Sequence, residues 1–230
     1  MRWARQSAYP LLVPFVSPIP ETEPPLDCPR CPRLVAFREA LRVEHPDWWN
    51  APVPAFGDPN AWLAIVGLAP GKHGANRTGR PFTGDFAGDL LFETLLKYGF
   101  ASGTYRADPE DGLALHGIII CNSVKCLPPE NKPLPQEIAN CRPFLAAQID
   151  AVANARVYIA LGQIAHQSAV RTLGGKLSEC KFGHLAEHRF PGGEVLIDSY
   201  HCSRYNQNTG RLSAGMFEAV FARARALNGA

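Results

Sequence analysis

Four short runs of consecutive apolar residues recur along the chain, and each leads into a loop. They cover residues 62–67, 117–122, 156–161 and 195–199. Because apolar and polar residues do not alternate within these runs, they predict strands that are covered on both faces, as in a parallel sheet.

Longer segments with helical spacing precede, separate and follow these runs. Helices are predicted over residues 33–43, 85–98, 134–152, 162–173 and 213–226. The alternation of strand and helix predicts an α/β fold, a single-domain sandwich of a central four-stranded parallel sheet flanked by helices on both faces. In such a sheet the ligand lies beyond the carboxyl ends of the strands, where the loops that follow them converge.

The N-terminal region is rich in proline, which fixes φ and removes a backbone donor. We therefore predict a Pro-rich arm over residues 1–27 and a single α/β domain over residues 28–230. Several prolines between positions 10 and 20 interrupt any signal-peptide helix, and no stretch of about 18 apolar residues could span a membrane. The chain is expected to be cytoplasmic, with no membrane contact.

Composition narrows the class of protein further. With 230 residues, 46% of them hydrophobic and 19% charged, the chain is too apolar to be disordered and too short for two full-sized domains. A net charge of +2 permits contact with nucleic acid without indicating it. The seven cysteines are odd in number, which favours thiols in a reducing compartment over a disulfide framework.

Four of the cysteines have the spacing of a metal or cluster site. Cys28 and Cys31 form a C-P-R-C motif, and Cys126 and Cys141 bracket a distant loop. A structural zinc usually takes its second pair from another short C-x-x-C, so the wide spacing of this second pair favours an iron–sulfur cluster over zinc. Unrelated buried thiols are the alternative for any single cysteine, and the preferred interpretation of the other three.

The first predicted strand leads into G-L-A-P-G-K-H-G, a loop dense in glycine. It does not match Walker A, because Gly67 and Gly71 enclose three residues and His73 follows Lys72. It contains no G-x-G-x-x-G dinucleotide motif either. What remains is a tight loop whose backbone can approach a ligand or phosphate closely, or an ordinary structural turn.

Two further loops carry candidate chemistry. Phe82 lies in a glycine-flanked loop, and Asp85 stands where the next helix begins. The two could be a core ring and a helix cap, or a ring that stacks on a base beside a carboxylate. His201 follows the fourth predicted strand and opens a polar loop, a position that favours a functional role over a structural one. The donors in that loop suit phosphate contacts.

Together these motifs closely resemble the uracil-DNA glycosylase superfamily and, within it, the iron–sulfur glycosylases of family 5, type b. The resemblance rests on G-L-A-P-G, G-R-P-F-T-G, C-N-S-V-K-C, and H-C-S-R-Y-N with T-G-R, in this order between Cys28 and Arg211. It implies a four-stranded parallel sheet and a 4Fe-4S cluster. The implied ligands of that cluster are Cys28, Cys31, Cys126 and Cys141.

The resemblance also implies a monofunctional DNA repair glycosylase. Such an enzyme flips a deaminated base out of DNA, hydrolyses its N-glycosidic bond and leaves an abasic site. The implied partners are double-stranded and single-stranded DNA containing uracil, with hypoxanthine, xanthine or other damaged bases as further candidate substrates. The protein is expected to act as a monomer.

The sequence departs from the superfamily at Leu68, where other branches carry an acidic or amide residue that handles the attacking water. An aliphatic side chain cannot hold a hydroxide or offset a cationic transition state. Asp85 is the nearest acid that could replace it, and is predicted to position water and stabilise the oxocarbenium-like sugar. His201 is predicted to hydrogen-bond the developing oxyanion of the leaving base.

The other predicted site residues contact the base or the DNA. Phe82 would stack on the extruded base, Asn122 would contact its polar edge, and residues 204–206 would fill the vacated stack. The base-binding set is Gly67, Leu68, Ala69, Phe82 and Asn122, and the DNA-binding set is Gly71, Lys72, Ser203, Arg204, Tyr205, Asn206 and Arg211.

Two other function classes remain open on the sequence. A ferredoxin-like electron carrier would also bind a cluster, but it would need neither the loop histidine nor a helix-covered sheet. A non-catalytic nucleic-acid-binding module would keep the basic loops and be indifferent to Asp85.

Overall fold

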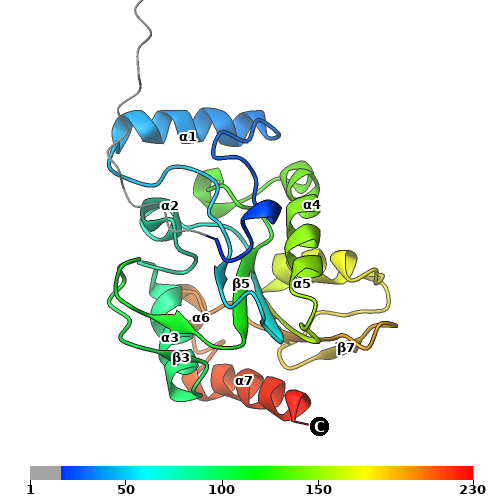
Figure 1. Ribbon diagram of the computed structural model, residues 1–230. Helices are drawn as coiled ribbons and strands as arrows, with labels where there is room; N and C mark the ends of the chain where they lie inside the picture. Colours follow the sequence, from blue (N-terminus) through cyan, green and yellow to red (C-terminus); the bar gives the residue numbers. More distant parts are fainter. Residues whose placement is uncertain (1–16, 230) are drawn as a thin grey trace, which may run out of the picture.

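A six-stranded sheet with helices on both faces forms the centre of the computed structural model, which describes residues 17–229 (Figure 1). The predicted arm is therefore described only from Ser17 onwards. There Ile19 is buried in the core, and Glu23 accepts hydrogen bonds from Ser17 Oγ at 2.7 Å and from the Ala55 amide at 2.8 Å. No helix of residues 17–229 is long and apolar enough to cross a membrane.

The helices and strands alternate along most of the chain. In order they are η1 (Pro20–Thr22), α1 (Pro32–Glu44), β1 (Phe56–Gly57), β2 (Leu63–Gly67), α2 (Ala75–Thr78), α3 (Phe86–Lys97), β3 (Ala101–Ser102), β4 (Ala114–Leu115), β5 (Ile118–Asn122), η2 (Pro129–Asn131), α4 (Pro135–Ala151), β6 (Val157–Leu161), α5 (Gln163–Thr172), β7 (Glu187–Arg189), β8 (Val195–Ser199), α6 (Arg204–Asn208) and α7 (Ala214–Asn228). The five predicted helices are α1, α3, α4, α5 and α7, and their ends agree to within two residues.

The four predicted strands are β2, β5, β6 and β8, and they pair in parallel in the order β5-β2-β6-β8. Every residue of these four strands is buried. The prediction of a four-stranded, wholly parallel sheet was wrong, because β1 and β7 add antiparallel strands at the two edges. These edge strands are two and three residues long and contain no apolar run, so the pattern along the chain could not reveal them.

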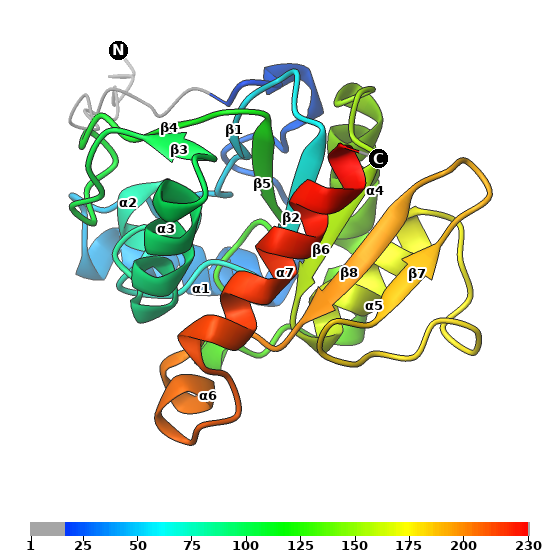
Figure 2. The ribbon, with the colours of Figure 1, turned by 90° about the horizontal axis from the view of Figure 1, so that it is seen from below.

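Each face of the sheet is covered by its own pair of helices (Figure 2). Leu63 and Ile65 of β2 pack in one core cluster with α3 and α7, whereas Ala64 and Val66 pack in another with α4 and α5. Parallel pairing brings the carboxyl ends of four strands to one edge of the sheet. The loops that follow these strands therefore meet there, as predicted.

A buried ion pair joins the loop between α2 and α3 to the loop between β3 and β4. Arg80 donates to both carboxylate oxygens of Asp111 at 2.8 Å and, through Nε, to Thr83 Oγ1 at 2.7 Å. The two charged side chains are 1% and 0% exposed. Burial alone raises the pKa of Asp111, but hydrogen bonds from Arg80 and from two backbone amides hold that pKa at about 2. The pair therefore stays charged at neutral pH.

Arg80→Met should be strongly destabilising, because it leaves the Asp111 carboxylate buried without its cation. We expect the free energy of unfolding to fall by about 3 to 5 kcal/mol in urea denaturation. Lys176→Met is the matched control, since it breaks an ion pair with Glu179 whose side chains are 77% and 67% exposed. The control should lose no more than about 1 kcal/mol. Equal losses in the two variants would show that burial adds nothing to the Arg80 pair.

Candidate active site

A cavity of about 460 Å³ lies at the edge of the sheet where β2 and β5 end. Its walls come from the loop after β2, the loop that enters α3, the end of β5, the loop before α4 and the loop after β8. The lining residues are Leu68, Ala69, Gly71, Ala75, Phe82, Asp85, Phe86, Ala87, Asn122, Asn131, His201, Ser203 and Arg204. Nine of these residues were predicted from the sequence, so segments far apart in the chain meet as expected.

Gly67, at the end of β2, permits the close approach of two cavity side chains. A Cβ atom at this position would lie 3.0 Å from the Phe82 ring and would overlap the side-chain oxygen of Asn122. Phe82 itself has a positive φ of 57°, a rare conformation for a residue with a side chain. The backbone is therefore shaped to bring the ring of Phe82 against the end of the strand.

The carboxylate of Asp85 lies against the glycine-rich loop. A Cβ atom at Gly71 would lie 2.6 Å from Asp85 Oδ1, and one at Gly74 would overlap the carboxylate. Asp85 directly precedes α3, yet its side chain makes no capping hydrogen bond. Burial raises the pKa of Asp85, while the Ala75 amide and nearby basic side chains oppose that rise. The side chain thus faces the cavity instead of capping the helix.

His201 stands across the cavity, two residues after β8. Its ring centroid lies 6.2 Å from that of Phe82, with the ring planes 28° apart. The backbone carbonyl of His201 accepts a hydrogen bond from Asn206 Nδ2 at 2.8 Å, which ties the loop to α6. Burial lowers the pKa of His201 to about 4, from an ordinary value of about 6.5. The imidazole is therefore neutral at pH 7.

Asn122 ends β5 and is 4% exposed. Its backbone carbonyl accepts a hydrogen bond from Lys125 Nζ at 2.7 Å. Within residues 17–229 the side-chain amide has no hydrogen-bond partner, so its donors and its acceptor remain available to a ligand in the cavity.

Several predicted DNA-binding residues lie outside the cavity wall. Lys72 Nζ forms an ion pair with Glu44 at 3.2 Å. Tyr205 on α6 is 71% exposed. The guanidinium of Arg211 lies over the Tyr200 ring at 4.6 Å. None of these three side chains lines the cavity.

Four cavity residues were missed by the sequence analysis. They are Ala75, Phe86, Ala87 and Asn131. Phe86 directly follows Asp85, and the guanidinium of Arg204 lies over its ring at 4.8 Å. Asn131 has a positive φ of 57° in η2, within a loop that the sequence analysis considered only for its cysteines. A turn-forming asparagine among prolines was the only available signal.

The four predicted cysteines line a second cavity, between the start of α1 and the loop after β5. They are Cys28, Cys31, Cys126 and Cys141. The Lys125 amide donates to Cys141 Sγ at 3.3 Å, and Asn140 Nδ2 lies 3.8 Å from Cys31 Sγ. Burial raises the pKa of Cys126 to about 12 and also raises those of Cys31 and Cys141.

Lys125 places a buried cation beside these thiols. The residue is 1% exposed, and its ammonium donates to the Asn122 carbonyl and to Gln148 Oε1. Within the described part of the chain no carboxylate forms an ion pair with it. Its positive charge favours the thiolate form of Cys141, against the effect of burial. A buried cation is costly unless an anion lies near it, so the donor set suits a negatively charged group.

The fold and the cavity define an α/β protein whose acid, imidazole, aromatic ring and amide meet at the carboxyl ends of parallel strands. The sequence profile of the Uracil DNA glycosylase superfamily matches residues 54–225, and the chain belongs to that superfamily. It is 44% identical over 209 residues to the Type-5 uracil-DNA glycosylase of Thermus thermophilus, covering 88% of this chain and 94% of the relative.

Two further relatives support the same placement. The Type-5 uracil-DNA glycosylase of Pyrobaculum aerophilum is 38% identical over 205 residues, which cover 87% of this chain and 89% of that protein. The Type-4 uracil-DNA glycosylase of Thermotoga maritima is 36% identical over 154 residues, covering 66% and 70%. The predicted resemblance is confirmed, and a ferredoxin-like electron carrier no longer fits.

Proposed function

We propose that the protein removes uracil from DNA by hydrolysing its N-glycosidic bond, leaving an abasic site. The observation that carries this proposal is the cavity itself, where Asp85, His201, Phe82 and Asn122 converge in a chain of the Uracil DNA glycosylase superfamily. The relatives named above are uracil-DNA glycosylases. The substrate base reaches the cavity by flipping out of the stack, at a cost of a few kcal/mol.

Asp85 acts on the sugar side of the bond. Bond cleavage builds positive charge on the sugar, and a carboxylate beside it stabilises the transition state more than the ground state. Leu68 in the same wall cannot do this, because its side chain is aliphatic. The lack of a hydrogen bond that caps α3 supports this role for Asp85. Its carboxylate accepts a hydrogen bond from the Ala75 amide and keeps further lone pairs for water or the sugar.

His201 acts on the side of the leaving base. The base departs with negative charge on its oxygen, and a neutral imidazole donates a hydrogen bond to that oxygen. The low pKa of His201 supports this role, since the ring carries no charge at pH 7. Phe82 offers a ring face for stacking, and the unpaired amide of Asn122 offers donors and an acceptor to the edge of the base.

The enzyme also removes other deaminated bases, including hypoxanthine and xanthine. A cavity of about 460 Å³ lies within the range of pockets that enclose drug-sized ligands, so a bicyclic purine fits by volume. Leu68 presents no polar group that would reject a larger base.

The protein acts as a monomer. Basic and polar side chains hold the DNA beside the cavity. Lys72, Ser203, Arg204 and Arg211 contact phosphates, which fix position without reading sequence. Exposed Tyr205, on α6 next to the cavity wall, fills the gap that the flipped base leaves.

The cysteine cavity holds a 4Fe-4S cluster. The donor set fits, because the four thiols line one cavity beside the buried cation of Lys125. A tetrahedral zinc would bring its sulfurs to about 3.8 Å from one another. No three cysteines of residues 17–229 have sulfurs within 4.8 Å of one another, which favours the wider cluster. The cluster joins the segment before α1 to the loop after β5, and its role is structural.

Asp85→Asn and Asp85→Ala should lower the single-turnover rate of uracil excision by roughly 100-fold or more, with binding of uracil-containing duplex retained. Asp89→Asn, an exposed acid in the first turn of α3, is the matched control and should keep the parent rate. Thermal melts run in parallel separate catalysis from capping, because a lost cap costs about 1 kcal/mol of stability. Rates within about threefold of the parent would remove Asp85 from the mechanism and leave it a structural role.

Cys141→Ser should lower the iron content of the purified protein and its thermal stability, because it removes one ligand of the cluster. Cys180→Ser is the matched control, since Cys180 lies outside the cysteine cavity, and it should keep the iron. The measurement is iron per chain together with visible absorption. A colourless parent protein with stoichiometric zinc on its cysteines, or full iron in Cys141→Ser, would contradict the assignment.

A further inference from the structure

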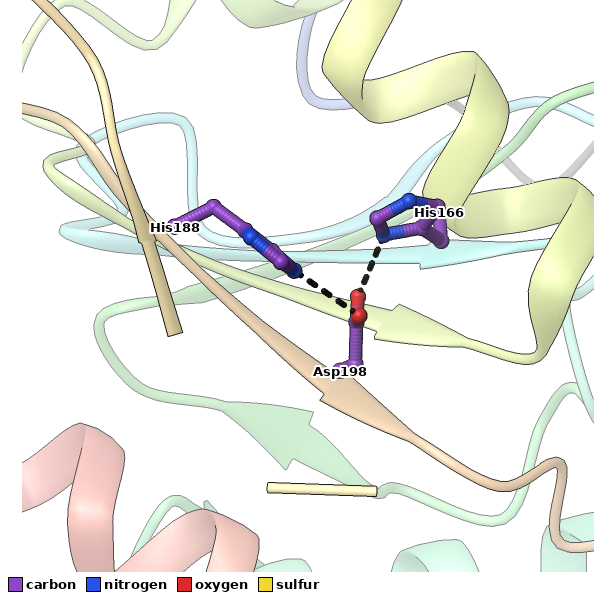
Figure 3. Close-up of side chains that lie close together, drawn as sticks. All are labelled: His166, His188 and Asp198. Carbon is purple, nitrogen blue, oxygen red and sulfur yellow. Dashed lines mark hydrogen bonds and ion pairs between the residues drawn. The ribbon is translucent and has the colours of Figure 1, made fainter. Parts of the chain in front are cut away.

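A second cluster of ionisable side chains lies on the face of the sheet that α4 and α5 cover. His166 comes from α5, His188 from β7 and Asp198 from β8, and Figure 3 shows both imidazoles pointing toward the carboxylate. One ligand atom from each residue lies within 4.8 Å of the other two. The side chains of His166 and Asp198 are 2% and 0% exposed, and that of His188 is 10% exposed. None of the three lines the cavity described above.

Both ring nitrogens of His166 face oxygen atoms, although a neutral imidazole carries only one ring proton. His166 Nε2 lies 3.1 Å from the carbonyl oxygen of Cys180, which can only accept, so Nε2 carries the ring proton. Nδ1 of a neutral ring then presents its lone pair to Asp198 Oδ1 at 2.7 Å. Two lone pairs at this distance repel each other. A proton can bridge the two atoms at this distance, or a bound metal ion can take both lone pairs, in which case tetrahedral coordination holds the two atoms about 3.3 Å apart.

The three converging residues are also of the types that bind zinc. Two imidazole nitrogens and a carboxylate oxygen are a common ligand set for zinc, with a fourth position for water. The Cys180 carbonyl on the far nitrogen of His166 is the usual outer partner that orients a metal-bound histidine.

A cavity beside the cluster reaches one of its three residues, His166. This cavity of about 190 Å³ is lined by His166 and by Cys180 of the loop before β7. A metal ion needs such a path to reach buried ligands. We propose that His166, His188 and Asp198 bind a zinc ion, which joins edge strand β7 to β8 and α5. This site is independent of the glycosylase activity and of the four cysteines.

The test uses the full-length purified protein with its iron retained, equilibrated with zinc sulfate and then desalted. Metal analysis should give about one zinc per chain in addition to the iron. The zinc K-edge absorption spectrum should show nitrogen and oxygen ligands at about 2.0 to 2.2 Å. Sulfur ligands at about 2.3 Å would place the zinc on the cysteines and overturn the proposal.

Variants assign the ligands. His188→Ala and Asp198→Asn should each weaken zinc binding by at least about 100-fold while leaving the iron content unchanged. His116→Ala, which removes an exposed histidine outside the cluster, should bind zinc like the parent. A parent protein that takes up no zinc, or a His188→Ala variant with parental affinity, would overturn the proposal and leave a proton between His166 and Asp198. The parent measurement stands even if a variant fails to fold.

Discussion

The absence of side chains at three glycines, one at the end of β2 and two in the loop after it, is the constraint on which the candidate active site depends. Gly71 and Gly74 leave room for the carboxylate of Asp85, and the glycine that ends β2 leaves room for Phe82 and Asn122. A Cβ atom at any of these positions would displace a group that lines the cavity. The glycine density that resembles a phosphate loop thus serves a different purpose, which is close packing of side chains onto backbone.

Burial also shifts the pKa values of Asp85 and His201, the two groups proposed to act in the reaction. It raises the pKa of Asp85 and lowers that of His201 to about 4, so each group is pushed toward its neutral form. The Ala75 amide and nearby basic side chains oppose the effect of burial on Asp85 and favour its ionised form. An anion and a neutral donor face one cavity, which matches a reaction that builds positive charge on a sugar and negative charge on a base.

The four central strands could be predicted because each is a continuous run of apolar residues in the sequence. Edge strands β1 and β7 are too short and contain too few apolar residues to form such a run. Much of the cavity followed from motifs, but Asn131 did not, since its place depends on how the loop before α4 folds back. The histidine cluster left no spacing signal. His166 and His188 stand 32 and 10 residues before Asp198, and only packing brings the three together.

The pH dependence of single-turnover uracil excision tests most directly whether an ionised Asp85 and a neutral His201 act together. The parent rate should be level around neutral pH and should fall as the pH drops through the raised pKa of Asp85, because protonation removes the anion. Asp85→Asn should lack that fall. No inflection should occur near the ordinary histidine value of about 6.5, since His201 stays neutral down to about pH 4. An inflection near about 6.5 that persists in Asp85→Asn and disappears in His201→Ala would contradict this assignment.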